Sequence, residues 1–242
     1  MTYCVGLLVD TGLVMLSDSR TNAGVDQIHT FRKMSTFVRA DDRVLVLMSA
    51  GNLAITQAVV NLLQEKPDDP ALDERIFRAT NMFNAARVVG DALREIHQRD
   101  AVDLKEHGHE FNGTFILGGQ IAGEEPRLFH IYSAGNFIES SIDTPYFQIG
   151  ESKYGKPIID RVITRSSSLA QAAKCVLVSM DSTMRSNLSV GPPLDLAIIR
   201  RDEFALHTHI SLDLDNEYFK MIRTRWGFAL QEVFSELPNP EW

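Results

Sequence analysis

Residues 2–19 of the chain read TYCVGLLVDTGLVMLSDS, which is two apolar runs on either side of the turn Asp10-Thr-Gly12. Apolar runs that flank such a turn are typical of a β-hairpin. The pattern repeats in the runs from His29 to Val38 and from Arg43 to Ala50, which are joined at Arg39-Ala-Asp-Asp42. The sequence therefore predicts four strands that form one antiparallel sheet at the start of the chain.

The remaining segments alternate between helical and strand patterns. Apolar positions and capping residues predict helices over residues 53–66, 76–98, 153–162, 169–184 and 217–237. Strand-like runs cover residues 111–117, 127–132, 137–142, 146–149, 194–200 and 204–210, and the polar stretch 100–110 is expected to be a loop. This order predicts an α+β fold, a four-layer αββα sandwich in which two stacked, mainly antiparallel sheets are covered by helices on both outer faces. We expect residues 1–242 to form a single domain.

The composition excludes several classes of protein. The 32 acidic residues outnumber the 24 Lys and Arg, and the net charge of −8 disfavours nucleic acid or an anionic membrane as the main partner. No apolar run reaches the ~18 residues of a membrane span, and the start of the chain lacks the basic and apolar segments of a secretory signal. Cys4 and Cys175 are too few for a disulfide framework, so we expect a cytoplasmic location and two buried, unreactive thiols.

Four residues near the start suggest chemistry: Thr2, Asp18, Arg20 and Lys33. A threonine that becomes terminal when Met1 is removed can use its own α-amine as the base for its hydroxyl. A nearby lysine would favour the neutral amine and lower the pKa of the hydroxyl, and a carboxylate would hold that lysine in place. Each residue also has a plain structural reading, in which Asp18 is a turn acceptor, Lys33 is an exposed strand residue and Arg20 is a surface charge.

As an ordered set, these segments resemble a known family. The opening Thr2-Tyr-Cys-Val5, the run Ser17–Asp26, Phe31-Arg-Lys33 and Ser49-Ala-Gly51 are similar to the proteasome β-subunits and their bacterial relatives, which are N-terminal-nucleophile (Ntn) hydrolases. The resemblance covers essentially the whole chain and is closest to a bacterial homologue. It implies the αββα sandwich and a threonine peptidase.

The resemblance also implies roles for individual residues. Thr2 would be the nucleophile, Lys33 would tune its hydroxyl, Asp18 would pair with Lys33, and the backbone N–H of Gly51 would bind the oxyanion. The family further places an Asp and a Ser beside the threonine, which Asp181 and either Ser186 or Ser189 would supply.

One position departs from the family pattern. The expected Gly-Ser-Gly reads Gly150-Glu151-Ser152, so that Glu151 stands where the family has a serine. Either Ser152 substitutes for it or the proton relay differs. Around the proposed oxyanion glycine, Met48, Leu53 and Gln57 are candidates for lining a side-chain pocket.

The sequence leaves three functions open. The first is a threonine-type peptidase that acts in a homo-oligomer, a ring or spiral stack, and whose possible ATPase partner is unknown. The second is a small-molecule or isopeptide amidase, and the third is an inactive assembling scaffold. We expect no cofactor and no metal, because no Cys or carboxylate cluster accompanies the pairs His107/His109 and His207/His209.

Overall fold

The hairpin predicted over residues 2–19 forms strands β1 (Tyr3–Val9) and β2 (Gly12–Asp18). The two strands are antiparallel, with Cys4 opposite Ser17 and Val9 opposite Gly12. Every residue of both strands is buried, so the hairpin lies at the centre of the molecule. The structure is a computed structural model that describes residues 1–22, 28–66 and 73–242. Residues 23–26 of the Ser17–Asp26 motif therefore lie outside the described residues.

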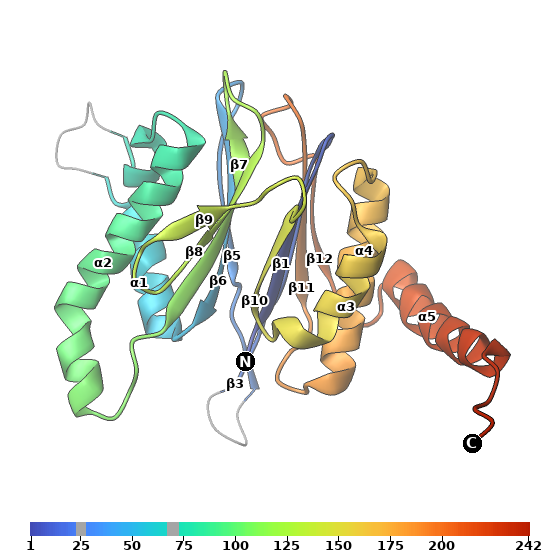
Figure 1. Cartoon of the computed structure of the whole chain (residues 1–242). Helices are drawn as coiled ribbons and strands as arrows, with labels where there is room; N and C mark the ends of the chain where they lie inside the picture. Colours follow the sequence, from blue (N-terminus) through green and yellow to red (C-terminus); the bar gives the residue numbers. More distant parts are fainter. Residues whose placement is uncertain (23–27, 67–72) are drawn as a thin grey trace.

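Two five-stranded sheets are stacked on each other (Figure 1). The first has the order β10-β1-β2-β11-β12 and the second the order β5-β6-β7-β8-β9, and all their neighbours are antiparallel. The further strands of the first sheet are β10 (Tyr146–Gly150), β11 (Leu194–Arg200) and β12 (Thr208–Leu212). Those of the second sheet are β5 (Met34–Arg39), β6 (Arg43–Gly51), β7 (Gly113–Ile121), β8 (Arg127–Ile131) and β9 (Phe137–Glu139). A separate small ribbon pairs β3 (Arg20–Asn22) with β4 (Ile28–Thr30).

Helices cover both outer faces of the stack (Figure 1). The second sheet is covered by α1 (Leu53–Gln64), a 3₁₀ helix (Arg75–Arg78) and α2 (Met82–Glu106). The first sheet is covered by α3 (Ser152–Val162) and α4 (Leu169–Ser186), and α5 (Glu217–Glu236) runs from α4 away from the sheets. The predicted four-layer αββα sandwich is confirmed.

Three apolar cores hold the layers together, one under each helix layer and one between the sheets. The core between the sheets includes Cys4, Met15, Val46, Met48 and Ile116. None of the described helices is both long enough and apolar enough to cross a membrane.

The prediction that the first four strands form one sheet is wrong: β1 and β2 belong to the first sheet, and β5 and β6 belong to the second. Three segments also differ from the sequence prediction. The run from His29 to Val38 is not one strand, because residues 31–33 leave the β geometry: the Phe31 N–H donates to the Ser19 carbonyl (2.9 Å) and the Lys33 carbonyl accepts from the Ser49 N–H (3.0 Å). Helix α2 continues through the predicted loop to Glu106, since Leu104 still packs on the core beneath it. The last strand begins only at Thr208, after two residues with positive φ in the turn, Asp202 and Phe204.

Candidate active site

A cavity of about 510 Å³ opens at the end of the sheet stack where β1 begins. Its walls come from the start of β1, the β3–β4 ribbon, the connection to β5, the end of β6, the start of α1 and the β10–α3 junction. They consist of Met1, Thr2, Thr21, His29, Phe31, Lys33, Ser49, Ala50, Gly51, Leu53, Thr56, Asn112, Gly150 and Glu151. The cavity therefore brings together three of the predicted site residues, Thr2, Lys33 and Gly51.

Lys33 reaches the cavity from the connection before β5, and two hydrogen bonds fix the position of its ammonium group. Its Nζ donates to Oδ1 of Asp18 at 2.7 Å and to the backbone carbonyl of Arg20 at 2.6 Å. Both side chains of the Lys33–Asp18 pair are buried. The predicted pairing is present, and the reading of Lys33 as an exposed strand residue is wrong.

Asp18 ends β2 and is bound by three donors. Besides Lys33, the backbone N–H of Tyr3 donates to Oδ1 (3.0 Å) and that of Gly191 donates to Oδ2 (3.3 Å). Burial raises the pKa of Asp18, and these hydrogen bonds act against that rise. Asp18 therefore connects three parts of the chain: Tyr3 next to Thr2, Lys33, and Gly191 in the segment before β11.

The backbone of Thr2 is fixed from the opposite side by the β10–α3 junction. The Glu151 N–H donates to the Thr2 carbonyl at 2.8 Å, and Tyr3 pairs with Gly150. Gly150 has φ of +81°, and a Cβ there would lie 1.9 Å from the Thr2 carbonyl oxygen. Only glycine allows this approach.

Tyr3 adds a side-chain anchor beneath the site. It is completely buried, its hydroxyl lies 2.5 Å from the hydroxyl of Ser179 on α4, and the side-chain amide of Gln148 donates to it. A buried phenol is stable only when its O–H is paired, so these bonds fix where β1 begins. Residue 2 consequently has a defined position.

Gly51 ends β6 on the other wall of the cavity. It has φ of +117°, and a Cβ would lie 2.4 Å from the Asn112 carbonyl oxygen. The next residue, Asn52, donates its N–H to that same carbonyl (2.7 Å) and caps α1 through its side chain. Backbone rather than a side chain therefore faces the cavity at this point.

Glu151 stands where the family pattern has a serine, and the structure places it at the cavity. It lines the cavity, and its partly buried carboxylate lies 3.9 Å from Nζ of the exposed Lys153. Ser152 begins α3 and is not among the cavity-lining residues. A carboxylate, not a hydroxyl, therefore occupies this wall.

The residues proposed from the end of α4 do not line the cavity. Asp181 accepts hydrogen bonds from Arg185 (3.0 Å) and from Arg223 of α5 (2.8 Å), so it joins α4 to α5. Ser186 is exposed at the last turn of α4, and Ser189 lies in the following turn, where its N–H donates to the Asn187 side chain.

The contribution that sequence reasoning missed is Gly191. It binds Asp18 and also accepts from the N–H groups of Ser19 (3.4 Å) and Arg20 (3.3 Å). The only sequence signal is a glycine before Pro192-Pro193, which by itself predicts a turn and not a contact with residue 18.

Of the side chains proposed to line a pocket, only some lie at the cavity. Leu53 lines the cavity, Gln57 lines a neighbouring hollow beside Lys33, and Met48 is buried between the sheets, so its predicted role as a pocket residue is wrong. Both cysteines are buried as predicted, and burial raises the pKa of Cys4 and raises that of Cys175 to about 12. Neither thiol is therefore a competing nucleophile.

The two histidine pairs lie apart from this cavity. His107 and His109 line a hollow with Asp100 and Asp103 at the end of α2. Across residues 1–22, 28–66 and 73–242, no group of three or more His, Cys, Asp or Glu is placed to hold a metal ion.

Solved structures similar to this chain share a name, Anbu. The chain is 51% identical to Anbu (ancestral β-subunit) from Yersinia bercovieri over 99% of both chains, with a TM-score of 0.91. It is 48% identical to Anbu from Hyphomicrobium sp. strain MC1 over 99% of this chain and 100% of that one, with a TM-score of 0.90. It is 46% identical, over 98% of both chains, to Anbu in a structure described as the helical assembly of the Anbu complex from Pseudomonas aeruginosa, with a TM-score of 0.91.

These similarities confirm the predicted resemblance to a bacterial homologue of the proteasome β-subunits. No protein-family model matches the chain, and no curated protein matches it.

Proposed function

Because this chain belongs to the Anbu family of proteasome-like proteins, we propose that it is a threonine-type peptidase whose nucleophile is Thr2. The observation that carries the proposal is that Thr2 and the buried Lys33–Asp18 pair meet at one cavity, opposite the backbone of Gly51. The family suggests a hydrolase, and the residues around the cavity suggest the chemistry.

The proposed reaction is acyl transfer through an ester. Once Met1 has been removed, the α-amine of Thr2 takes the proton of its own hydroxyl, and Oγ attacks the carbonyl carbon of the scissile amide. The tetrahedral intermediate collapses, the C–N bond breaks, and the leaving amine takes that proton. Water, activated by the same α-amine, then attacks the ester, which releases the carboxylic acid and restores the Thr2 hydroxyl.

Lys33 and Gly51 would assist this reaction electrostatically. The positive charge of Lys33 favours the neutral α-amine and lowers the pKa of the Thr2 hydroxyl. A backbone N–H at Gly51 aimed at the developing oxyanion would stabilise the transition state by ~3–4 kcal/mol. Asp181, Ser152 and Ser189 stay outside this proposal, since none of them lines the cavity.

A second candidate function is favoured by Glu151. A carboxylate on the cavity wall suits a substrate with a positive charge near the scissile bond, such as a small-molecule amide or a γ-linked isopeptide whose α-ammonium group is free. Assays with short fluorogenic peptides and with γ-linked amides separate the two functions: cleavage of only the amides would favour the amidase.

An inactive scaffold is the third function. Retention of Met1 in the native host would favour this function, because the α-amine would then be on the wrong residue. Intact-mass measurement decides this, since the active-enzyme proposal requires a chain lighter by one methionine.

We also propose that the chain self-assembles into a ring or spiral and works in the cytoplasm. The assembly is supported by the relative described as a helical assembly, and the location by two unpaired, buried cysteines.

The test of the catalytic proposal is Thr2→Ala. Alanine, like threonine, is small enough for Met1 removal, so the variant changes only the hydroxyl and its methyl group. We expect turnover to fall by at least about 10³-fold, with Thr11→Ala on the β1–β2 turn as the matched control that keeps full activity. Unchanged turnover in purified Thr2→Ala would sink the proposal.

A further inference from the structure

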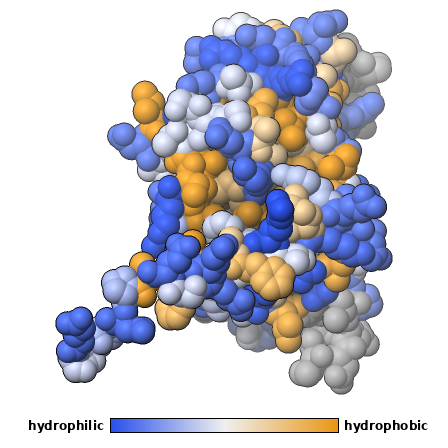
Figure 2. All heavy atoms as spheres, turned by 90° about the vertical axis from the view of Figure 1, so that its right-hand side faces the viewer, coloured by the Kyte–Doolittle hydropathy of each residue, from blue (hydrophilic) through white to orange (hydrophobic). Residues whose placement is uncertain are grey.

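Asp195 of β11 is a buried carboxylate that the proposed mechanism does not use, and it is only 2% exposed. Its neighbours Leu194 and Leu196 belong to the core beneath α4 and α5, the helix layer whose outer face has hydrophobic side chains gathered at its centre (Figure 2). Because successive side chains of a strand point to opposite faces of a sheet, Asp195 faces the core between the two sheets, as Ala197 does. A carboxylate in such a place is costly unless it is paired.

The hydrogen bonding of Asp195 is incomplete. Within the part of the chain that the structure describes, its Oδ2 has no hydrogen-bond partner, and neither has the hydroxyl of Ser17, which is directly opposite on β2. Burial raises the pKa of Asp195, while the charges of Arg32 and His209 act against that rise. The ion-pair partner of Asp195 is Arg32, whose Nη1 lies 3.7 Å from Oδ1. Asp195 is therefore a buried charge that is compensated mainly by Arg32.

Arg32 lies in the middle of the break at residues 31–33. The backbone of the break is bound at its two ends, at the first residue to Ser19 and at the last residue to Ser49. The Arg32 side chain, which is 67% exposed, adds a contact from the middle of the break to Asp195. This contact joins the break to β11 of the first sheet.

Arg32 and Lys33 are consecutive basic residues, and each pairs with an aspartate of the first sheet. Lys33 pairs with Asp18 at the end of β2, and Arg32 pairs with Asp195 near the start of β11. Asp18 is opposite Leu194 in the register, so the two aspartates lie on neighbouring strands, one residue apart. The alternation of side chains along a strand places them on opposite faces of the sheet. The two cations therefore hold this end of the sheet from both faces.

We propose that Asp195 is a positioning residue for the reaction at Thr2: through Arg32 it holds the break at residues 31–33 against the first sheet, which keeps Nζ of Lys33 at the cavity. Asp195 does not line the cavity, so it acts on the rate only through the position of the lysine. A displacement of about 1 Å that starts far from the reacting atoms can lower a rate by up to about 100-fold.

This inference rests on the proposed function of Thr2, but its first test does not depend on activity. Amide hydrogen exchange of the full chain, resolved to single residues, reports on the Ser49 N–H that is bound to the break. Asp195→Asn and Arg32→Ala should each raise its exchange rate at least about fivefold, because the middle of the break is released. The matched controls are Asp73→Asn and Arg39→Ala, which separate the exposed pair at the far end of β5 and should leave this rate unchanged. Unchanged exchange in either Asp195→Asn or Arg32→Ala would overturn the inference.

The second test is the acylation of Thr2 by a β-lactone, separated into the binding constant KI and the rate constant of acylation. Arg32→Ala and Asp195→Asn should each lower the rate constant about tenfold and leave KI unchanged, because the lysine is displaced while the cavity stays open. Arg32→Lys keeps the charge and should regain most of the loss. The double variant Arg32→Ala/Asp195→Asn should be no slower than either single variant, since both changes break one ion pair. Losses that multiply in the double variant would contradict a shared role.

The same variants separate positioning from other roles. Arg32 lines the hollow beside the cavity, whereas Asp195 lines neither, so a loss of rate in Arg32→Ala alone would indicate a direct contact with the ligand and overturn the inference. A lower melting temperature with an unchanged rate constant would indicate a purely structural ion pair and would also overturn it. If Thr2 of the unmodified chain is not labelled, the catalytic proposal fails, and the exchange rate of the Ser49 N–H still decides whether Asp195 positions the break.

Discussion

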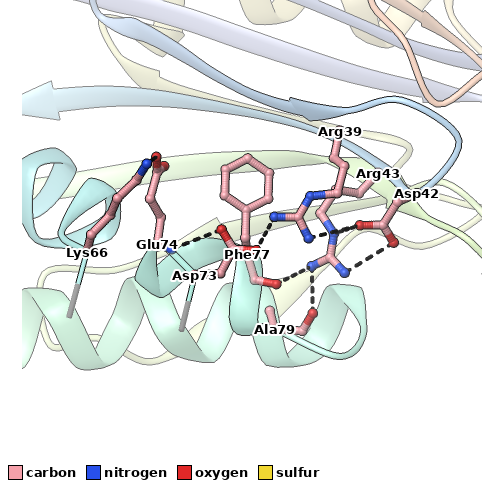
Figure 3. Close-up of polar contacts among 8 residues, drawn as sticks. All are labelled: Arg39, Asp42, Arg43, Lys66, Asp73, Glu74, Phe77 and Ala79. Atoms are coloured by element: carbon pink, nitrogen blue, oxygen red, sulfur yellow. Dashed lines mark hydrogen bonds and ion pairs between the residues drawn. The ribbon is translucent and has the colours of Figure 1, made fainter. Parts of the chain in front are cut away.

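The Lys33–Asp18 pair at the cavity and the Arg39–Asp73 pair on the surface are both ion pairs between a cation and an aspartate. The side chains of Lys33 and Asp18 are 7% and 0% exposed, whereas those of Arg39 and Asp73 are 42% and 41% exposed. The surface pair belongs to a group in which Arg43 also binds Asp42 and the carbonyls of Phe77 and Ala79, at the edge between β5–β6 and the 3₁₀ helix (Figure 3).

The pKa values of the buried and the exposed aspartates shift in opposite directions. Burial raises the pKa of Asp18 even though three groups donate hydrogen bonds to it. On the surface, the Arg43 hydrogen bond lowers the pKa of Asp42 and the Arg39 hydrogen bond lowers that of Asp73. A buried ion pair is thus a costly means of holding a charge in one position, and such a cost is expected where the charge has a function.

The largest effect should follow from breaking the buried pair on one side. Lys33→Met leaves Asp18 buried without its cation, and we expect the free energy of unfolding to fall by about 3–5 kcal/mol in urea titrations. The double variant Asp18→Asn/Lys33→Met removes both charges and should regain part of this loss. If Lys33→Met were as stable as the unmodified chain, the buried pair would matter no more to stability than the surface pair.

Two glycines allow the same comparison between the cavity and the surface for the backbone. Gly150 and Gly123 have similar positive φ, +81° and +87°, but a Cβ meets the Thr2 carbonyl only at Gly150 and nothing within 4 Å at Gly123. We expect Gly123→Ala to cost about 1–2 kcal/mol through φ alone. Gly150→Ala should cost more and also displace Thr2, which would lower turnover by up to about 100-fold. Equal losses of stability and activity in the two variants would contradict the account of how Thr2 is held.

Breaking the surface pair should have little effect. We expect Asp73→Asn to leave the melting temperature unchanged within the error of thermal unfolding, because solvent screens an exposed pair. Added salt should not alter that comparison. A clear drop in melting temperature would mean that the surface group stabilises the fold as much as the buried pair does.

The smallest effect is the pH dependence of the surface group. Since the folded pKa values of Asp42 and Asp73 are lowered, their stabilising contribution is present above the unfolded value of about 4 and is lost as the pH falls through the folded values. The stability difference between the unmodified chain and Asp42→Asn/Asp73→Asn should therefore shrink on going from pH 6 to pH 3. Asp18 has the opposite sign: its contribution is present below about pH 4 and is lost as the pH rises through its raised folded value. A difference that grows in acid would contradict the assigned directions.

Local patterns predicted much of this molecule. The alternation of apolar runs and turns predicted the β1–β2 hairpin and the layer order, because burial and strand period act within a few residues. The resemblance in the first part of the chain placed Thr2, Lys33 and Gly51 together, and they line one cavity.

What the sequence could not predict depends on distant contacts. The bond between Gly191 and Asp18 joins residues 173 positions apart, and no local pattern signals it. Asp181 looked suitable because a carboxylate near the end of a helix was expected beside the threonine, but Arg223 of α5 binds it instead. The break at residues 31–33, which directs Lys33 into the cavity, likewise depends on Ser19 and Ser49.

The most direct test of the central claim is covalent labelling by an electrophile that acylates a terminal threonine, such as a β-lactone. Cys4 is in the same proteolytic peptide, so Cys4→Ala serves as the control that must keep its label, and Thr2→Ala as the variant that must lose it. The account predicts an intact mass that lacks Met1 and carries one adduct, mapped by fragmentation to Thr2. Retention of Met1 in the native host, or an adduct on any residue other than Thr2, would contradict it.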